Sequence, residues 1–128
     1  MKDLRSPLAK AKGLGASGDA SHHFWVQRLS ALAMITLVIW ICFSIAFLPE
    51  ANYATVVAWL QSPINGIITL LFVIISFYHA QLGLQVIIED YVSSHSKRLA
   101  GVLFIKFLSY FLMAAGVYAV IKITLGGH

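Results

Sequence analysis

The most chemically distinctive side chain of this 128-residue sequence is a histidine, His79, that lies inside a long apolar run. An ionisable group at membrane depth is costly, and it usually faces a partner, a cavity or a cofactor instead of lipid. Imidazole is the commonest protein ligand for metals, and it binds haem iron axially. A haem ligand needs a neutral ring nitrogen aimed at iron among apolar side chains. The more ordinary role is a hydrogen bond between helices, and position alone leaves both roles open.

Two further candidates, Asp90 and Tyr91, stand where the same apolar run ends. At 1.5 Å per helical residue they lie about 16 Å from His79, at the edge of a membrane. A phenol can donate a hydrogen bond to a quinone carbonyl, and a neighbouring carboxylate can support proton delivery. Both residue types are also common at the ends of membrane spans. Taken alone, the pair therefore fits an ordinary span end better than a quinone site.

Three apolar stretches must position these groups. Hydrophobic residues make up 59% of the chain and charged residues only 11%, well below the roughly 25% that is usual in soluble domains. The stretches cover about residues 29–48, 64–88 and 99–125, and crossing a bilayer as a helix takes about 20 residues. The sequence predicts an all-α integral membrane protein with three transmembrane helices, formed by residues 29–128 behind a basic N-terminal segment of residues 1–28.

The distribution of basic residues predicts the orientation. Five precede the first span (Lys2, Arg5, Lys10, Lys12 and Arg28), the loop of residues 49–63 has no Lys or Arg, and Lys97 and Arg98 follow the second span. The positive-inside rule places the N-terminus and the second loop on the cytoplasmic side of a bacterial inner membrane, or on the matrix side of a mitochondrial one. The net charge of +4 is then a topology signal, and no nucleic-acid partner is expected.

Local signals predict details of the helices. Ser21 is a suitable N-cap for the first helix. Residues 52–61 have the spacing of a short amphipathic helix on the outer membrane surface, and Pro63 suits the first turn of the second span. Gly83, one turn after His79, would let a backbone or a flat macrocycle approach that face closely.

A haem held by two histidines cannot be completed by this chain alone. The other histidines stand before the first span (His22 and His23), in the second loop (His95) and beyond the third span (His128). The second axial imidazole would have to come from a partner chain or a second copy. Arg28 enters the first helix from the cytoplasmic side, where it could pair with a haem propionate or act only as a basic membrane anchor.

Taken together, these features resemble a known family. Residues 79–92, with their His-Ala, their glycine and their Asp-Tyr-Val, resemble the second helix of the succinate dehydrogenase hydrophobic membrane anchor, the smaller three-helix anchor of the four-subunit complex II. The resemblance extends to the length, the three spans, the basic tail, and the order His22, Phe24 and Arg28 before the first span. Gln81 departs from it, since an apolar or aromatic residue would be unremarkable there, and this leaves the lipid-facing side of the helix in question.

The resemblance implies a role for each candidate residue. His79 would be one axial ligand of the iron of haem b, with the second supplied by a companion cytochrome b anchor subunit. Tyr91 would hydrogen bond to ubiquinone with Asp90 beside it, and Arg28 would approach the haem propionates. The other partners would be an iron–sulfur subunit, a flavoprotein subunit and membrane lipid. The chain would thus be the non-catalytic anchor of a succinate:ubiquinone oxidoreductase, in the respiratory chain and the tricarboxylic acid cycle.

Other functions remain open. A fumarate reductase anchor shares the architecture. Another small b-type cytochrome subunit would keep His79 without needing Asp90 and Tyr91, and a non-redox structural protein would use His79 as an interhelical hydrogen bond. A small proton-coupled exporter is disfavoured, because none of the three spans has a carboxylate at mid-membrane.

Overall fold

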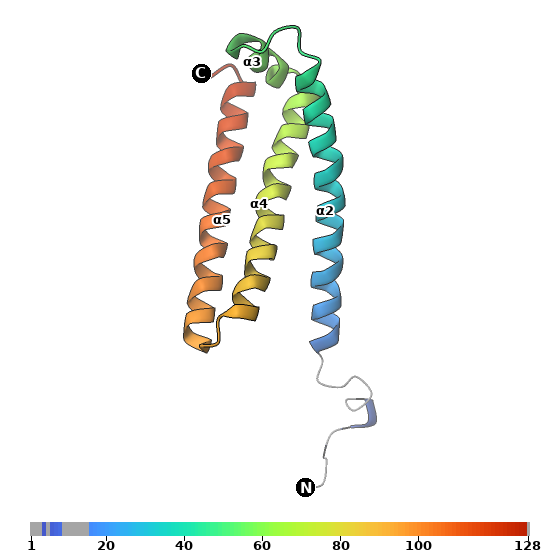
Figure 1. The fold of residues 1–128 in the computed structure, drawn as a ribbon, viewed down its shortest axis with the longest axis vertical. Coiled ribbons are helices and arrows are strands. Elements are labelled where there is room, and N and C mark those ends of the chain that lie inside the picture. Colours follow the sequence, from blue (N-terminus) through green and yellow to red (C-terminus); the bar gives the residue numbers. More distant parts are fainter. Residues whose placement is uncertain (1–3, 5, 9–15, 128) are drawn as a thin grey trace.

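The computed structural model describes Leu4, residues 6–8 and residues 16–127. Its helices follow one another in the order α2 (Ala16–Ala46), α3 (Tyr53–Gln61), α4 (Pro63–Tyr91) and α5 (His95–Thr124), as Figure 1 shows. Within these described residues, three segments are long and apolar enough to cross a membrane, namely Ala20–Ala46, Pro63–Tyr91 and His95–Thr124. The predicted all-α fold with three transmembrane helices is confirmed.

Helix α3 and the start of α4 lie where the sequence predicts them. Asn52 caps α3, because its side-chain oxygen accepts hydrogen bonds from the backbone N–H and the hydroxyl of Thr55, both at 2.8 Å. Helix α4 begins at Pro63, where the missing N–H of proline has no helical partner to lose. The Gln61 side chain donates a hydrogen bond of 3.3 Å to the carbonyl of Ile123 and so ties α3 to the end of α5.

Helix α2 begins earlier than the sequence predicts. Ser21, the expected N-cap, lies inside α2, which already begins at Ala16, so that prediction is wrong. Residues 16–28 extend the first transmembrane helix, and the four basic residues before them lie outside the described part of the chain. Hydropathy marks where a helix enters the apolar layer, whereas its backbone hydrogen bonds can continue into the polar interface.

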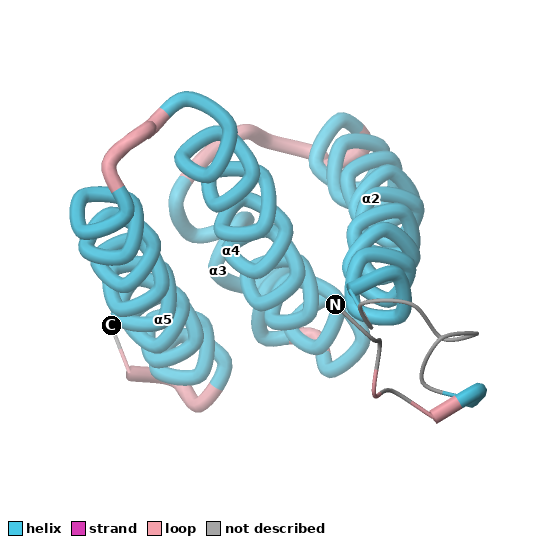
Figure 2. The backbone as a smooth tube through the Cα atoms, turned by 90° about the horizontal axis from the view of Figure 1, so that it is seen from below, coloured by secondary structure: helices cyan, strands magenta, loops and turns pink. Residues whose placement is uncertain are grey.

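Helix α4 is the central helix. It packs against both α2 and α5, so the three spans stand in a row, as Figure 2 shows from one end. Gly116 of α5 permits a close approach to α4, since a Cβ built there would lie 2.7 Å from Cγ1 of Val73. Small residues allow such contacts between membrane helices. A row of three helices leaves two broad faces that the described residues do not cover.

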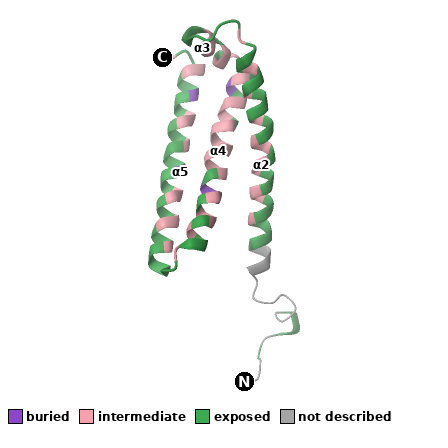
Figure 3. Ribbon diagram, viewed as in Figure 1, coloured by how far each residue is buried: buried purple, intermediate pink, exposed green. Residues whose placement is uncertain are grey.

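Few side chains of the described residues are buried, and Figure 3 colours the ribbon purple at the buried residues. The buried apolar ones are Val57, Leu82 and Val120, and the buried polar ones are Gln81 and Ser109. Gln81 is only 3% exposed, so it does not lie on a lipid-facing side. The extensive apolar surface that remains suits contact with lipid or with other membrane helices.

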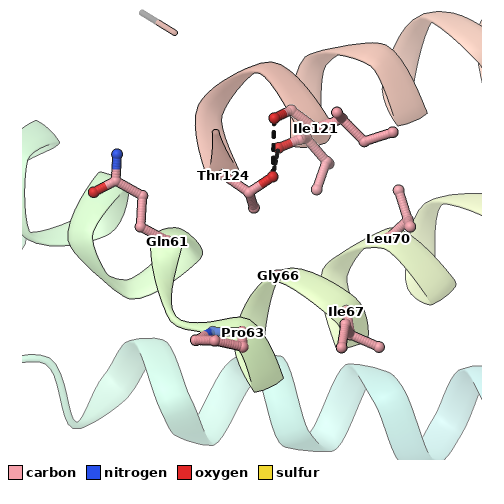
Figure 4. Close-up of a pocket in the computed structure, with 8 residues that line it drawn as sticks. Gln61, Pro63, Gly66, Ile67, Leu70, Ile121 and Thr124 are labelled. Atoms are coloured by element: carbon pink, nitrogen blue, oxygen red, sulfur yellow. Dashed lines mark hydrogen bonds between the residues drawn. The ribbon is translucent and has the colours of Figure 1, made fainter. Parts of the chain in front are cut away.

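The two ends of the row differ in structure. The start of α2 and the α4–α5 loop lie at one end, and α3 and the C-terminal end lie at the other (Figure 1). Any three antiparallel spans have this arrangement, so the membrane side of each end stays a prediction from the basic residues. At the end with α3, an open and mostly apolar hollow of about 280 Å³ lies between α3, α4 and α5 (Figure 4). The Thr124 hydroxyl beside it is 2.9 Å from the carbonyls of Val120 and Ile121 in its own helix.

Candidate functional site

His79 faces α2 and is half-buried there. Its Nδ1 atom lies 2.9 Å from the Oγ atom of Ser30, a residue of α2 that is 49 positions away in the sequence. The Ser30 hydroxyl also donates a hydrogen bond of 2.9 Å to the carbonyl of Gln27. His79 therefore joins two helices, as one of its two predicted roles requires. Within the described residues, its other ring nitrogen, Nε2, makes no hydrogen bond.

An open hollow of about 350 Å³ lies beside His79 and is lined on the α2 side by Phe24, Gln27, Arg28 and Ala31. The guanidinium carbon of Arg28 stands 4.8 Å from the centre of the Phe24 ring, which is a cation–π distance. The structure thus brings Arg28 and His79, predicted from separate parts of the sequence, to the same hollow. An imidazole nitrogen, a guanidinium and an aromatic ring form a set that fits the iron, the carboxylates and the macrocycle of a haem.

The surface around Gly83, one turn from His79, is open. A Cβ built on Gly83 meets nothing within 4 Å. The predicted close approach at this glycine is therefore not made by another helix of the described residues, which leave the space open to a further group. The tight helix contacts occur at Gly66 and Gly116 instead, where a built Cβ comes within 3 Å of a neighbouring side chain.

Asp90 and Tyr91 form the end of α4 and are both exposed. The Tyr91 side chain is 83% exposed, and in the described part of the chain neither side chain makes a hydrogen bond. Their polar neighbours are engaged locally: Glu89 accepts a hydrogen bond of 2.9 Å from Gln85, and Arg98 donates one of 3.0 Å to the carbonyl of Val92. Along α4, Asp90 and Tyr91 lie about 16 Å from His79, so they do not share the hollow beside His79 and are a separate candidate.

The other described histidines lie near the starts of their helices. His22 and His23 belong to the early turns of α2, and His95 is the first residue of α5 rather than part of a loop. His128 lies outside the described residues, which contain no group of three or more His, Cys, Asp or Glu able to hold a metal ion. A second imidazole for His79 would have to come from another chain.

Comparison with known proteins decides the family. The model of the family described as succinate dehydrogenase/fumarate reductase transmembrane subunit matches residues 2–115. The chain belongs to this family. It is 34% identical over 118 residues to the succinate dehydrogenase hydrophobic membrane anchor subunit of Rickettsia bellii, covering 92% of this chain and 94% of that relative. The subunit of the same name from Paracoccus denitrificans is 28% identical over 121 residues, covering 94% and 93%.

These matches support the resemblance found in the sequence. The chain is a membrane anchor subunit of a succinate dehydrogenase complex, held in the membrane by its three apolar helices. A third relative with this name, from Rickettsia conorii, is 33% identical over 97 residues and covers 75% of this chain and 77% of its own. No solved structure matches the chain significantly.

Sequence reasoning missed one residue of the site, Ser30. A hydroxyl near the start of an otherwise apolar span was the available signal. It pointed to no partner, because hydropathy does not say which face of the first helix meets the second. Only the packing of α2 on α4 places Ser30 against His79.

Proposed function

We propose that this anchor subunit supplies His79 as one axial ligand of haem b, while the companion anchor subunit supplies the other. The observation that carries the proposal is the hollow that His79 shares with Arg28. The guanidinium would pair there with a propionate carboxylate. The open surface at Gly83 leaves room for a flat group beside the ligand. A bound haem b would accept and release single electrons.

A second proposal concerns ubiquinone, at the end of α4. The Tyr91 phenol would donate a hydrogen bond to a quinone carbonyl, and the Asp90 carboxylate would support proton delivery to it. The exposure of both side chains, and the absence of hydrogen bonds to either among the described residues, support this role. The electrons would come from succinate through the flavoprotein and iron–sulfur subunits. Other contacts to the quinone would come from the companion anchor and the iron–sulfur subunit.

The N-terminal side of the membrane would face the bacterial cytoplasm or the mitochondrial matrix, as the basic residues predict. The flavoprotein and iron–sulfur subunits would then dock on the side where α4 ends at Tyr91. The family also includes fumarate reductase subunits, but the relatives from Rickettsia bellii and Paracoccus denitrificans are named for succinate dehydrogenase. We therefore propose succinate oxidation as the physiological direction.

A reduced-minus-oxidised optical spectrum of the assembled complex tests the ligand. His79→Ala should abolish the b-type haem signal, because no other described histidine lies at that depth. His95→Ala, at the start of α5, is the matched control and should keep the signal. A full b-type signal in the His79→Ala complex would refute the assignment.

A further inference from the structure

The hydroxyl of Ser30 connects two groups. Its oxygen lies 2.9 Å from the backbone carbonyl oxygen of Gln27 in the same helix, and 2.9 Å from Nδ1 of His79 on α4. Both separations are in the range of good hydrogen bonds. Ser30 is half-buried, and no other side chain of the described residues hydrogen bonds to His79.

The chemistry of a hydroxyl then selects one tautomer of His79. A serine has a single hydrogen to donate, whereas its oxygen can also accept. A carbonyl oxygen can only accept, so the hydrogen between Ser30 and Gln27 must come from serine. The Ser30 oxygen is left to accept from His79, which requires a hydrogen on Nδ1. In the opposite tautomer, Nδ1 of His79 would accept the serine hydrogen. The Ser30 oxygen and the Gln27 carbonyl oxygen would then lie 2.9 Å apart with no hydrogen between them.

A neutral imidazole carries a hydrogen on only one of its two nitrogens. With Nδ1 protonated, Nε2 has its lone pair available and makes no hydrogen bond within the described residues. Metal-bound histidines commonly donate their other ring N–H to an oxygen, which fixes the ring and makes it a more basic ligand. Ser30 and His79 have this arrangement.

Apolar side chains strengthen the contact. A second open hollow, of about 310 Å³, borders Ser30 and is lined mostly by apolar side chains, with Tyr78 beside them. Its walls include Val26, Leu29 and Ala33 of α2 and Ile75 of α4. A hydrogen bond in such surroundings competes little with water and is electrostatically stronger than one in solvent.

We infer that Ser30 is a positioning residue: by accepting from Nδ1 and donating to Gln27, it holds His79 in the tautomer and orientation that present Nε2 to the haem iron. This inference rests on the proposed role of His79 and deepens it. A more basic axial ligand stabilises the oxidised iron, so the Ser30 contact lowers the midpoint potential of the haem.

The test uses the whole complex in membranes, with the midpoint potential and the low-spin electron paramagnetic resonance spectrum of the haem as readouts. Ser30→Ala should keep the complex assembled, shift the potential upward and change the resonance spectrum. Ser30→Thr retains a hydroxyl, so its midpoint potential and resonance spectrum should be closer to those of the wild type. Thr36→Ala is the matched control: the Thr36 hydroxyl also bonds to its own helix, at 3.1 Å to the carbonyl of Leu32, and its loss should shift neither.

The results separate the two proposals. If His79→Ala keeps the b-type signal, the ligand assignment itself fails. If His79→Ala loses it while Ser30→Ala has the wild-type potential and spectrum, the ligand stands and the role of Ser30 is refuted. Loss of haem in Ser30→Ala supports the inference when Ser30→Thr restores haem, and refutes it when Ser30→Thr also loses haem. A shift of the midpoint potential in Thr36→Ala as large as that in Ser30→Ala would likewise refute the inference.

Discussion

Replacing Tyr91 by phenylalanine removes one hydroxyl and little else from this subunit. The side chain is 83% exposed at the end of α4, and its phenol makes no hydrogen bond in the part of the chain that the structure describes. The substitution therefore leaves the subunit's own contacts intact. A loss of function must then come from a group outside the described residues, and in the proposed site that group is a quinone carbonyl.

The size of the effect follows from one neutral hydrogen bond. Such a bond contributes about 0.5–1.5 kcal/mol, and 1.4 kcal/mol corresponds to a factor of ten. The apparent KM for ubiquinone should thus rise about 2- to 13-fold in the Tyr91→Phe complex. Succinate oxidation with an artificial acceptor, which takes electrons before the quinone, should stay at the wild-type rate.

Steady-state assays with both acceptors measure these quantities on the same membranes. Tyr53→Phe is the matched control, because Tyr53 is also exposed but begins α3 at the opposite end of the row. It should leave the KM for ubiquinone unchanged. An unchanged KM in Tyr91→Phe would remove Tyr91 from the quinone site. An equal loss of both activities would show destabilisation of the complex instead.

Two further predictions concern the packing of α5 and the role of Arg28. Gly116→Ala should destabilise the solubilised complex by about 1–3 kcal/mol, as overpacking does, because the new Cβ would lie 2.7 Å from Val73 Cγ1. The temperature at which the complex dissociates measures this loss of stability. Adding Val73→Ala should restore part of the loss, and a double variant less stable than Gly116→Ala would contradict the contact. Arg28→Gln should lower the haem midpoint potential, since a nearby positive charge favours the reduced form. Arg28→Lys should lower it less, and a redox titration in which neither variant shifts the potential would place Arg28 away from the haem.

Much of the fold was readable from the sequence, because a lipid environment allows few solutions. A chain that crosses the hydrocarbon layer must satisfy its backbone hydrogen bonds internally, so long apolar runs become helices. The positions of His79 and Tyr91 relative to each other also follow, since both lie on one helix with a fixed rise per residue. Asn52 and Pro63 mark helix starts through their own local chemistry. Ser21 misled for the opposite reason: it could cap a helix, but the helix continues past it.

The contacts between helices were decided only by the tertiary structure. A span that is apolar all round has no hydrophobic face to show which side meets its neighbour. Nothing in the sequence therefore says that Ser30 meets His79, or that Arg28 shares a hollow with it. The rotation and depth at which α2 packs on α4 determine both. The sequence by itself determined that a histidine lies within a membrane span, and the packing determined which of its nitrogens is held by Ser30 and which has no partner within the described chain.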